Sequence, residues 1–90
     1  NTYNLRLSNA SEQTLYLQAA VKGFDHIELT GLPQTLEIPA GEIINVPVQV
    51  ATYPEYATKG SHPIEFTFRY HTEENQEWRS INENSNFIGE

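Results

Sequence analysis

Apolar and polar residues alternate along most of the chain, and a period of two residues is typical of half-buried β-strands. Every second position is apolar in residues 3–7, 15–21, 44–50 and 64–70. Shorter runs cover residues 27–29 and 36–38, and residues 78–87 form a more polar final run. No window keeps a 3.6-residue period, so the pattern predicts about seven short strands and no substantial helix.

Residues that favour turns separate these runs. Asn9–Ser11 follow the first run and Gly23 ends the second. Pro39–Gly41 predict a tight turn, because proline fixes φ and glycine accepts a positive φ. Residues 72–77 predict an acidic hairpin loop. Pro47 lies within the run 44–50 and cannot donate to a β-ladder, so we expect that strand at a sheet edge or with a bulge.

These elements predict an all-β fold, an immunoglobulin-like antiparallel β-sandwich of about seven strands. We expect alternate residues of four strands to share one core: Leu5, Leu7, Leu15, Leu17, Val46, Val48, Phe66 and Phe68. True immunoglobulin domains have two cysteines that bracket a core tryptophan. This chain has no cysteine, and Trp78 comes too late to take that position. The expected likeness is therefore one of shape, with no disulfide.

Length and charge narrow the class of protein. Ninety residues predict a single domain, residues 1–90. The chain lacks methionine and any signal peptide, so we expect a processed product or a piece excised from a longer protein. Its apolar stretches span only a few residues, so any membrane anchor is expected outside it. Five scattered bases against twelve acids give a net charge of −7, which disfavours nucleic acid and anionic membranes as partners.

Few residues suit catalysis or metal binding. The absence of cysteine excludes thiolate zinc sites, iron–sulphur ligation and cysteine nucleophiles in this chain. We expect His62 and His71 at the two ends of one strand, too far apart to share a metal. His26 and Glu28 are expected on one strand face, where they could bind a metal weakly or form a solvated polar face. Asp25 is expected to point away from His26, so no catalytic triad is predicted.

We therefore predict no enzymatic activity, no catalytic residue and no bound cofactor for this chain. We also expect it to bind copper weakly or not at all, because it lacks the cysteine and methionine ligands that select Cu(I).

Three loop features remain. Residues 73–77 are rich in oxygen ligands but lack the pattern of a calcium loop, so a solvated hairpin tip is the ordinary interpretation. Asn9–Ser11 fit the N-glycosylation acceptor pattern, although turn chemistry explains them adequately. Tyr53 and Tyr56, with Pro54 between them, are a candidate contact surface because aromatic residues are enriched at interfaces. Alternatively, the two tyrosines close one end of the core.

Several short motifs are shared with a known family. They are Asn1-Thr2-Tyr3-Asn4-Leu5, Gly31-Leu32-Pro33, Ala40-Gly41-Glu42, Val46-Pro47-Val48, Gly60-Ser61 followed by Pro63-Ile64, and Phe87-Ile88-Gly89. Over nearly its whole length the sequence resembles the C-terminal immunoglobulin-like domain of the FixG/CcoG family of cytochrome c oxidase accessory proteins. Glu90 stands where the resemblance leads us to expect proline.

The resemblance implies a setting for the domain. Members of this family are inner-membrane proteins with iron–sulphur motifs, implicated in copper handling and assembly of cytochrome c oxidase, and the sandwich is expected on the periplasmic side. The family's redox residues are cysteines, so none can be transferred to this chain. The implied function is a non-catalytic interaction or structural module. Its partner would be a protein of oxidase assembly or the parent's own membrane portion. The alternative is an accessory module of a secreted carbohydrate-active or cell-surface protein.

Overall fold

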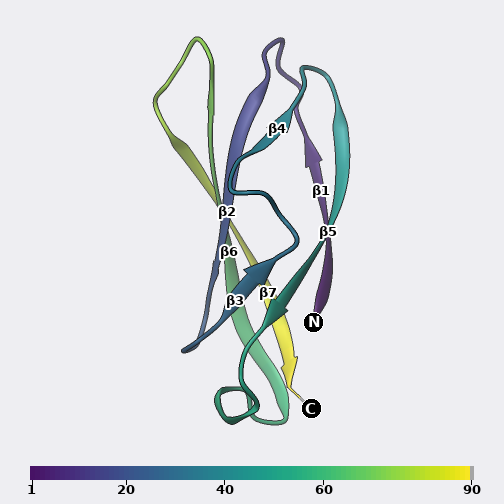
Figure 1. The fold of residues 1–90 in the computed structure, drawn as a ribbon, viewed down its shortest axis with the longest axis vertical. Helices are drawn as coiled ribbons and strands as arrows, with labels where there is room; N and C mark the ends of the chain where they lie inside the picture. Colours follow the sequence, from purple (N-terminus) through teal and green to yellow (C-terminus); the bar gives the residue numbers. More distant parts are fainter. Residues whose placement is uncertain (90) are drawn as a thin grey trace.

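A computed structural model describes residues 1–89 and shows an antiparallel β-sandwich (Figure 1). One sheet has three strands in the order β1-β5-β3, and the other has four in the order β4-β2-β6-β7. The strands are β1 (Thr2–Ser8), β2 (Leu15–Lys22), β3 (Glu28–Thr30), β4 (Leu36–Ile38), β5 (Ile43–Ala51), β6 (Gly60–Thr72) and β7 (Arg79–Gly89). The helical part of residues 1–89 is one 3-10 turn, η1 (Pro54–Tyr56), and no helix there is long and apolar enough to span a membrane. The predicted all-β sandwich is confirmed.

The core lies between the two sheets and follows the alternation in the sequence. Its buried members are Leu17, Ile38, Val50, Ala57, Ile64, Phe66, Phe68 and Phe87. Of the predicted core residues, Val48 is also buried, Leu5, Leu7 and Leu15 are half-buried against this cluster, and Val46 is half-buried. The predicted face is therefore correct on all four strands. The deepest packing extends further toward Phe87 than the sequence indicated.

The position of Pro47 corrects one expectation. Its strand, β5, lies between β1 and β3 and is not an edge strand, and its register with β1 continues through Pro47 without a bulge. Asn1 and Val50 exchange backbone hydrogen bonds of 2.8 and 2.9 Å, so the backbone N–H and C=O of Val50 point toward β1. Because these groups alternate in direction along a strand, those of Val48 also point toward β1. Pro47 therefore turns toward β3, which pairs with β5 only as far as Gln49. Pro47 lacks an N–H on the side of β3, where β3 has already ended, so no hydrogen bond of the sheet is lost there.

The turn after β1 is built around Asn9, whose side chain is 1% exposed. Its Nδ2 donates to the carbonyls of Gln13, Ile38 and Pro39 at 2.7, 2.8 and 3.2 Å. Its Oδ1 accepts from the backbone and hydroxyl of Ser11. The turn interpretation of Asn9–Ser11 is confirmed, and the amide that a glycan would need is buried and occupied.

The first and last described strands meet at one end of the sandwich. The side chain of Asn1 bonds to the backbone of Ile88, and the start of the chain and the end of β7 both lie in the lower half of Figure 1. Beside them, Gly89 packs against the loop that follows η1, where a Cβ on this glycine would come within 2.0 Å of the Thr58 oxygen. This contact explains why a glycine ends the Phe87–Gly89 motif.

Candidate functional site

Three aromatic side chains form an exposed cluster at the end of the sandwich where η1 lies, at the bottom of Figure 1. Tyr53 is 60% exposed and Tyr56 is 40% exposed, and His26 is also exposed. The His26 ring lies 4.3 Å from that of Tyr56 and 6.0 Å from that of Tyr53, measured between centroids. We call His26, Tyr53 and Tyr56 the end patch. The sequence indicated Tyr53 and Tyr56 as a pair, but it did not predict that His26 packs beside them.

Two local structures hold the end patch in place. His26 lies in the turn between β2 and β3 with a φ of 58°, a left-handed conformation that non-glycine residues adopt rarely. The hydroxyl of Thr52 donates to the carbonyl of Asp25 at 3.3 Å, which ties this turn to the end of β5. Pro54 begins η1, and the Tyr56 N–H donates to the Tyr53 carbonyl at 2.9 Å. The three aromatic rings therefore project from two loops, each held by a hydrogen bond to a backbone carbonyl.

Other residues close this end of the core, which corrects the alternative interpretation of the two tyrosines. Phe87 and Ala57 are buried here, and the Phe24 ring meets that of Phe87 edge to face at 5.3 Å. Tyr53 and Tyr56 lie outside this layer. Exposed aromatic side chains on a loop that a β-sandwich holds in place are the kind of feature that interfaces use.

The pair His26 and Glu28 is arranged differently from the expectation. His26 belongs to the turn, and Glu28 is the first residue of β3, so the two do not share a strand face. Both line an open hollow of about 430 Å³ together with Thr52 and Tyr53. Within residues 1–89, no group of three histidine, aspartate or glutamate side chains is placed to hold a metal ion. That the chain binds copper weakly or not at all stays a prediction.

His62 and His71 lie near the two ends of β6, as expected, and their side chains lie on opposite faces of the strand. The Nε2 of His62 lies 2.6 Å from the Thr58 carbonyl, close to the end patch. His71 is on the outer face of the larger sheet, where its ring stacks on Tyr16 at 5.2 Å and meets Trp78 edge to face at 4.5 Å. We call Tyr16, His71 and Trp78 the sheet row.

The sheet row was not predicted, because it depends on the pairing of β2 with β6 that places Tyr16 opposite His71. Its rings pack on one another at interplanar angles of 24° and 76°, so they do not form one flat platform. The Arg69 guanidinium lies 4.9 Å from the centre of the Trp78 ring. The phenol of Tyr16 donates to Glu73 at 2.7 Å, and this hydrogen bond, with burial and nearby carboxylates, raises the pKa of Tyr16.

The acidic loop after β6 uses its side chains to join neighbouring elements. Glu73 accepts from Tyr16, and Glu74 accepts from the Gln13 amide at 2.7 Å. The Asn75 N–H donates to the Thr72 hydroxyl at 3.0 Å, which shapes the loop. These contacts agree with the interpretation of residues 73–77 as a hairpin tip.

Comparisons with known proteins assign this arrangement to a recognised type of domain. A family model described as "IG-like fold at C-terminal of FixG, putative oxidoreductase" matches residues 1–90. The chain is also similar to the crystal structure of a FixG-related protein from Vibrio parahaemolyticus, with a TM-score of 0.78 and 27% sequence identity. That similarity covers 99% of this chain and 77% of the other. No curated protein matches the chain.

Proposed function

The chain belongs to the family of immunoglobulin-like domains at the C-terminus of FixG, and from this membership we propose that it is a non-catalytic interaction module of a larger membrane-bound protein. In this proposal the larger protein carries iron–sulphur clusters and acts in copper handling and assembly of cytochrome c oxidase. The domain lies on the periplasmic face of the bacterial inner membrane. It holds no cofactor and contributes through contact with the parent's membrane portion or with an assembly protein.

The end patch is the observation that carries this proposal. In a protein that has this domain at its C-terminus, the preceding chain enters at Asn1. A shallow hollow of about 330 Å³, lined by Asn1, Pro54 and Ile88 among others, connects that point to η1. The exposed rings of Tyr53 and Tyr56 therefore lie beside the place where the rest of such a protein connects. Tyrosine suits this role because it combines a large apolar surface with a polar hydroxyl.

The alternative, an accessory module of a secreted carbohydrate-active or cell-surface protein, has less support. An aromatic platform would favour it, and the sheet row is the nearest arrangement to one in the described residues. Its rings are occupied by one another and by Arg69. Family membership also favours the first function.

Two alterations of the full-length parent protein test the proposal. The first deletes residues 1–90. The second replaces Tyr53 and Tyr56 by alanine, with Trp78→Ala as a matched control because Trp78 is an exposed aromatic residue outside the end patch, 38% exposed. We expect the deletion and the double tyrosine variant to reduce oxidase assembly in cells, while cluster content and in vitro redox activity are kept. Trp78→Ala should leave assembly unchanged.

Two results would contradict the proposal. If cluster redox chemistry disappears in a deletion variant that is folded and present at normal levels, the domain contributes more than contact. If oxidase assembly is normal in the double tyrosine variant and impaired by Trp78→Ala, the contact surface lies elsewhere. Thermal unfolding of the isolated domain variants separates a lost contact from a lost fold.

A further inference from the structure

The strand β7 is the longest edge strand among the described residues. β7 has eleven residues and ends the larger sheet, whereas the edge strand β1 has seven residues and the edge strands β3 and β4 have three each. Short edge strands, prolines and lysines protect natural sheets from unwanted pairing. β7 contains neither proline nor lysine. It therefore presents a row of backbone donors and acceptors of the kind that can pair with another strand.

Contacts with β1 show which residues of β7 face this edge. The Asn1 side chain bonds to both the N–H and the C=O of Ile88, and the Tyr3 hydroxyl donates to the carbonyl of Asn86. Successive residues of an antiparallel strand turn these groups to alternate sides. Ser80, Asn82 and Asn84 therefore turn their backbone groups to the same edge as Asn86 and Ile88.

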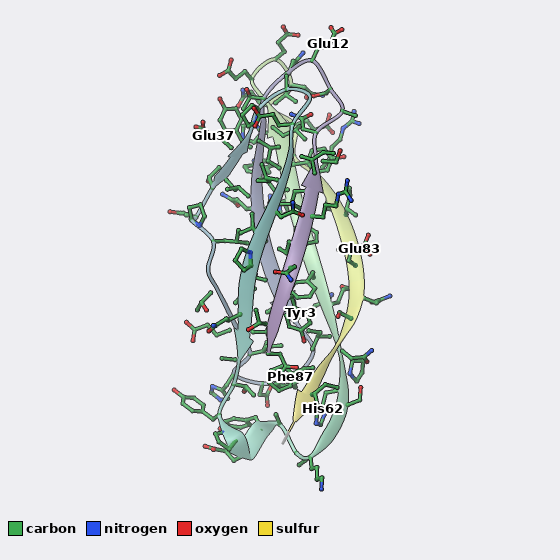
Figure 2. All side chains as sticks on the ribbon, turned by 90° about the vertical axis from the view of Figure 1, so that its right-hand side faces the viewer. Tyr3, Glu12, Glu37, His62, Glu83 and Phe87 are labelled. Atoms are coloured by element: carbon green, nitrogen blue, oxygen red, sulfur yellow. The ribbon has the colours of Figure 1, made fainter. Side chains whose placement is uncertain are left out.

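This edge has a covered half and an open half. Asn1 and Tyr3 cover it at Asn86 and Ile88, close to Phe87 in Figure 2. Beyond them, every residue from 79 to 84 is exposed, and no side chain of residues 1–89 forms a hydrogen bond to these backbone groups. The open half is about six residues, or roughly 20 Å, long.

An apolar groove lies beside the open half, between the two sheets. It has a volume of about 340 Å³ and is lined mainly by apolar residues that include Leu7 of β1, Leu17 of β2, Phe68 of β6 and Ile81 of β7. Ile81 is 50% exposed although it lies opposite Phe68 in the sheet and points to the core side. A strand added along β7 would place alternate side chains over this groove, because side chains alternate between the two faces of a sheet.

The charge around the open half defines the partner. Six glutamates lie in the strands and loops at this end of the sandwich: Glu12, Glu37, Glu42, Glu73, Glu74 and Glu77 (Figure 2 shows Glu12 and Glu37 there). Glu83 lies in the open half itself, and three arginines, Arg6, Arg69 and Arg79, belong to the same half of the sandwich, so carboxylates outnumber guanidinium groups. A partner segment with basic residues at this end is favoured over an acidic one.

We propose that the open half of β7 binds an extended segment of a partner protein by strand addition. The segment has apolar residues at alternate positions, which fill the groove beside Phe68 and Ile81, and basic residues at the end next to the glutamates. The backbone groups of Ser80, Asn82 and Asn84 provide the hydrogen bonds. This surface is separate from the end patch, so it does not depend on the function proposed above. Main-chain pairing with side-chain pockets at alternate positions is a known mode of peptide recognition.

A synthetic peptide tests this proposal on the 90-residue chain. The probe has three valines alternating with threonines and two lysines at its C-terminal end, which lies beside the glutamates if it runs antiparallel to β7. Nuclear magnetic resonance titration should shift the amide signals of Ser80, Asn82 and Asn84 in a saturable way. The same peptide with two glutamates in place of the lysines should bind more weakly.

Substitutions on β7 make the test specific. Asn82→Pro removes an N–H that faces the open edge and leaves the bonds to β6 in place, so we expect binding to weaken about tenfold. Asn82→Ala keeps this N–H and should bind like the unchanged chain. If Asn82→Pro fails to fold, Ile81→Lys tests the groove instead, with Ile88→Lys as its control because Ile88 is equally exposed and points away from the core.

Three results would overturn the proposal. The first is a titration without saturation, or with signal shifts that do not include the amides of Ser80, Asn82 and Asn84. The second is equal binding by Asn82→Pro and Asn82→Ala when both are folded. The third is a dimer of the chain itself that forms through β7, detected by analytical ultracentrifugation without peptide and abolished by Asn82→Pro, because the occupant would then be a second copy.

Discussion

The side-chain amide of Asn1 pairs with the backbone of Ile88 in the way that the backbone of a neighbouring strand would. Its Nδ2 donates to the Ile88 carbonyl at 3.0 Å, and its Oδ1 accepts from the Ile88 N–H at 2.8 Å. The backbone of Asn1 pairs with Val50 of the other sheet, so a single residue joins β5 to β7 across the sandwich. This bridge closes one half of the β7 edge and leaves the other half open.

Asn1→Ala should destabilise the domain and loosen the end of β7. Two hydrogen bonds are lost at an exposed site, so we expect a decrease of about 1 kcal/mol in the free energy of unfolding. The Ile88 amide should exchange faster with solvent. Chemical denaturation and hydrogen exchange measure the two effects. Asn4→Ala is the control, because Asn4 is an exposed asparagine of β1, the strand that follows Asn1, and its side chain makes no hydrogen bond to the other described residues. Equal stability of the two variants would refute the bridging role of Asn1.

Asn9→Ala should be more costly than Asn1→Ala. Asn9 is buried, and its removal leaves the carbonyls of Gln13, Ile38 and Pro39 without their common donor. We expect a loss of about 2–3 kcal/mol on chemical denaturation. Asn9→Asp should cost more, because a carboxylate would face the same carbonyl oxygens. Ser11→Ala removes a hydroxyl that bonds to Asn9 and to the backbone of Gln13, but the two bonds to Gln13 are exposed, so it should cost less than either.

The same geometry predicts that the folded domain carries no glycan at Asn9 when it is offered to a glycosylating enzyme. Intact-mass measurement checks this. A glycan on Asn9 of folded protein would show that the turn opens in solution.

Phe66→Ala should strongly destabilise the domain. Phe66 is 3% exposed, and its ring meets Tyr3 of the opposite sheet edge to face at 5.3 Å. We expect a loss of about 3–5 kcal/mol in the free energy of unfolding. Ile81→Ala is the control, since Ile81 is half-exposed and lies on the same face of the neighbouring strand. A loss below about 1 kcal/mol for Phe66→Ala would place this ring outside the core.

The sequence predicted the elements well because its alternation determines which face of each strand is buried. Leu17, Val48, Phe66 and Phe68 were placed in the core by spacing alone, and all four are buried. The spacing of a strand does not say which strands are its neighbours. Pro47 was therefore expected at an edge, although its strand is central and only the far side of that residue is unpaired.

The candidate sites were predicted less completely, because each combines residues distant in the sequence. Tyr53 and Tyr56 stand three residues apart and were found as a pair, but His26 joins them through the packing of two loops. Glu28 was paired with His26 by assuming that the strand began earlier than it does. The left-handed turn at His26 leaves no periodic signal in the sequence.

The last prediction concerns Tyr16, whose phenol donates to Glu73. This hydrogen bond holds the phenolic proton, and burial and the nearby charges of Glu73 and Glu37 act in the same direction, so the pKa of Tyr16 is raised from the ordinary 10.0. The stabilisation that results is fully present below pH 10.0 and is lost as the pH rises through the higher pKa of the folded state. Glu73→Gln should therefore lower the pKa of Tyr16 toward its ordinary value, measured by nuclear magnetic resonance of its ring carbons. Glu77→Gln is the matched control, because Glu77 belongs to the same loop and does not contribute to the shift. An unchanged Tyr16 pKa in Glu73→Gln would show that the bond between β2 and the hairpin loop does not persist in solution.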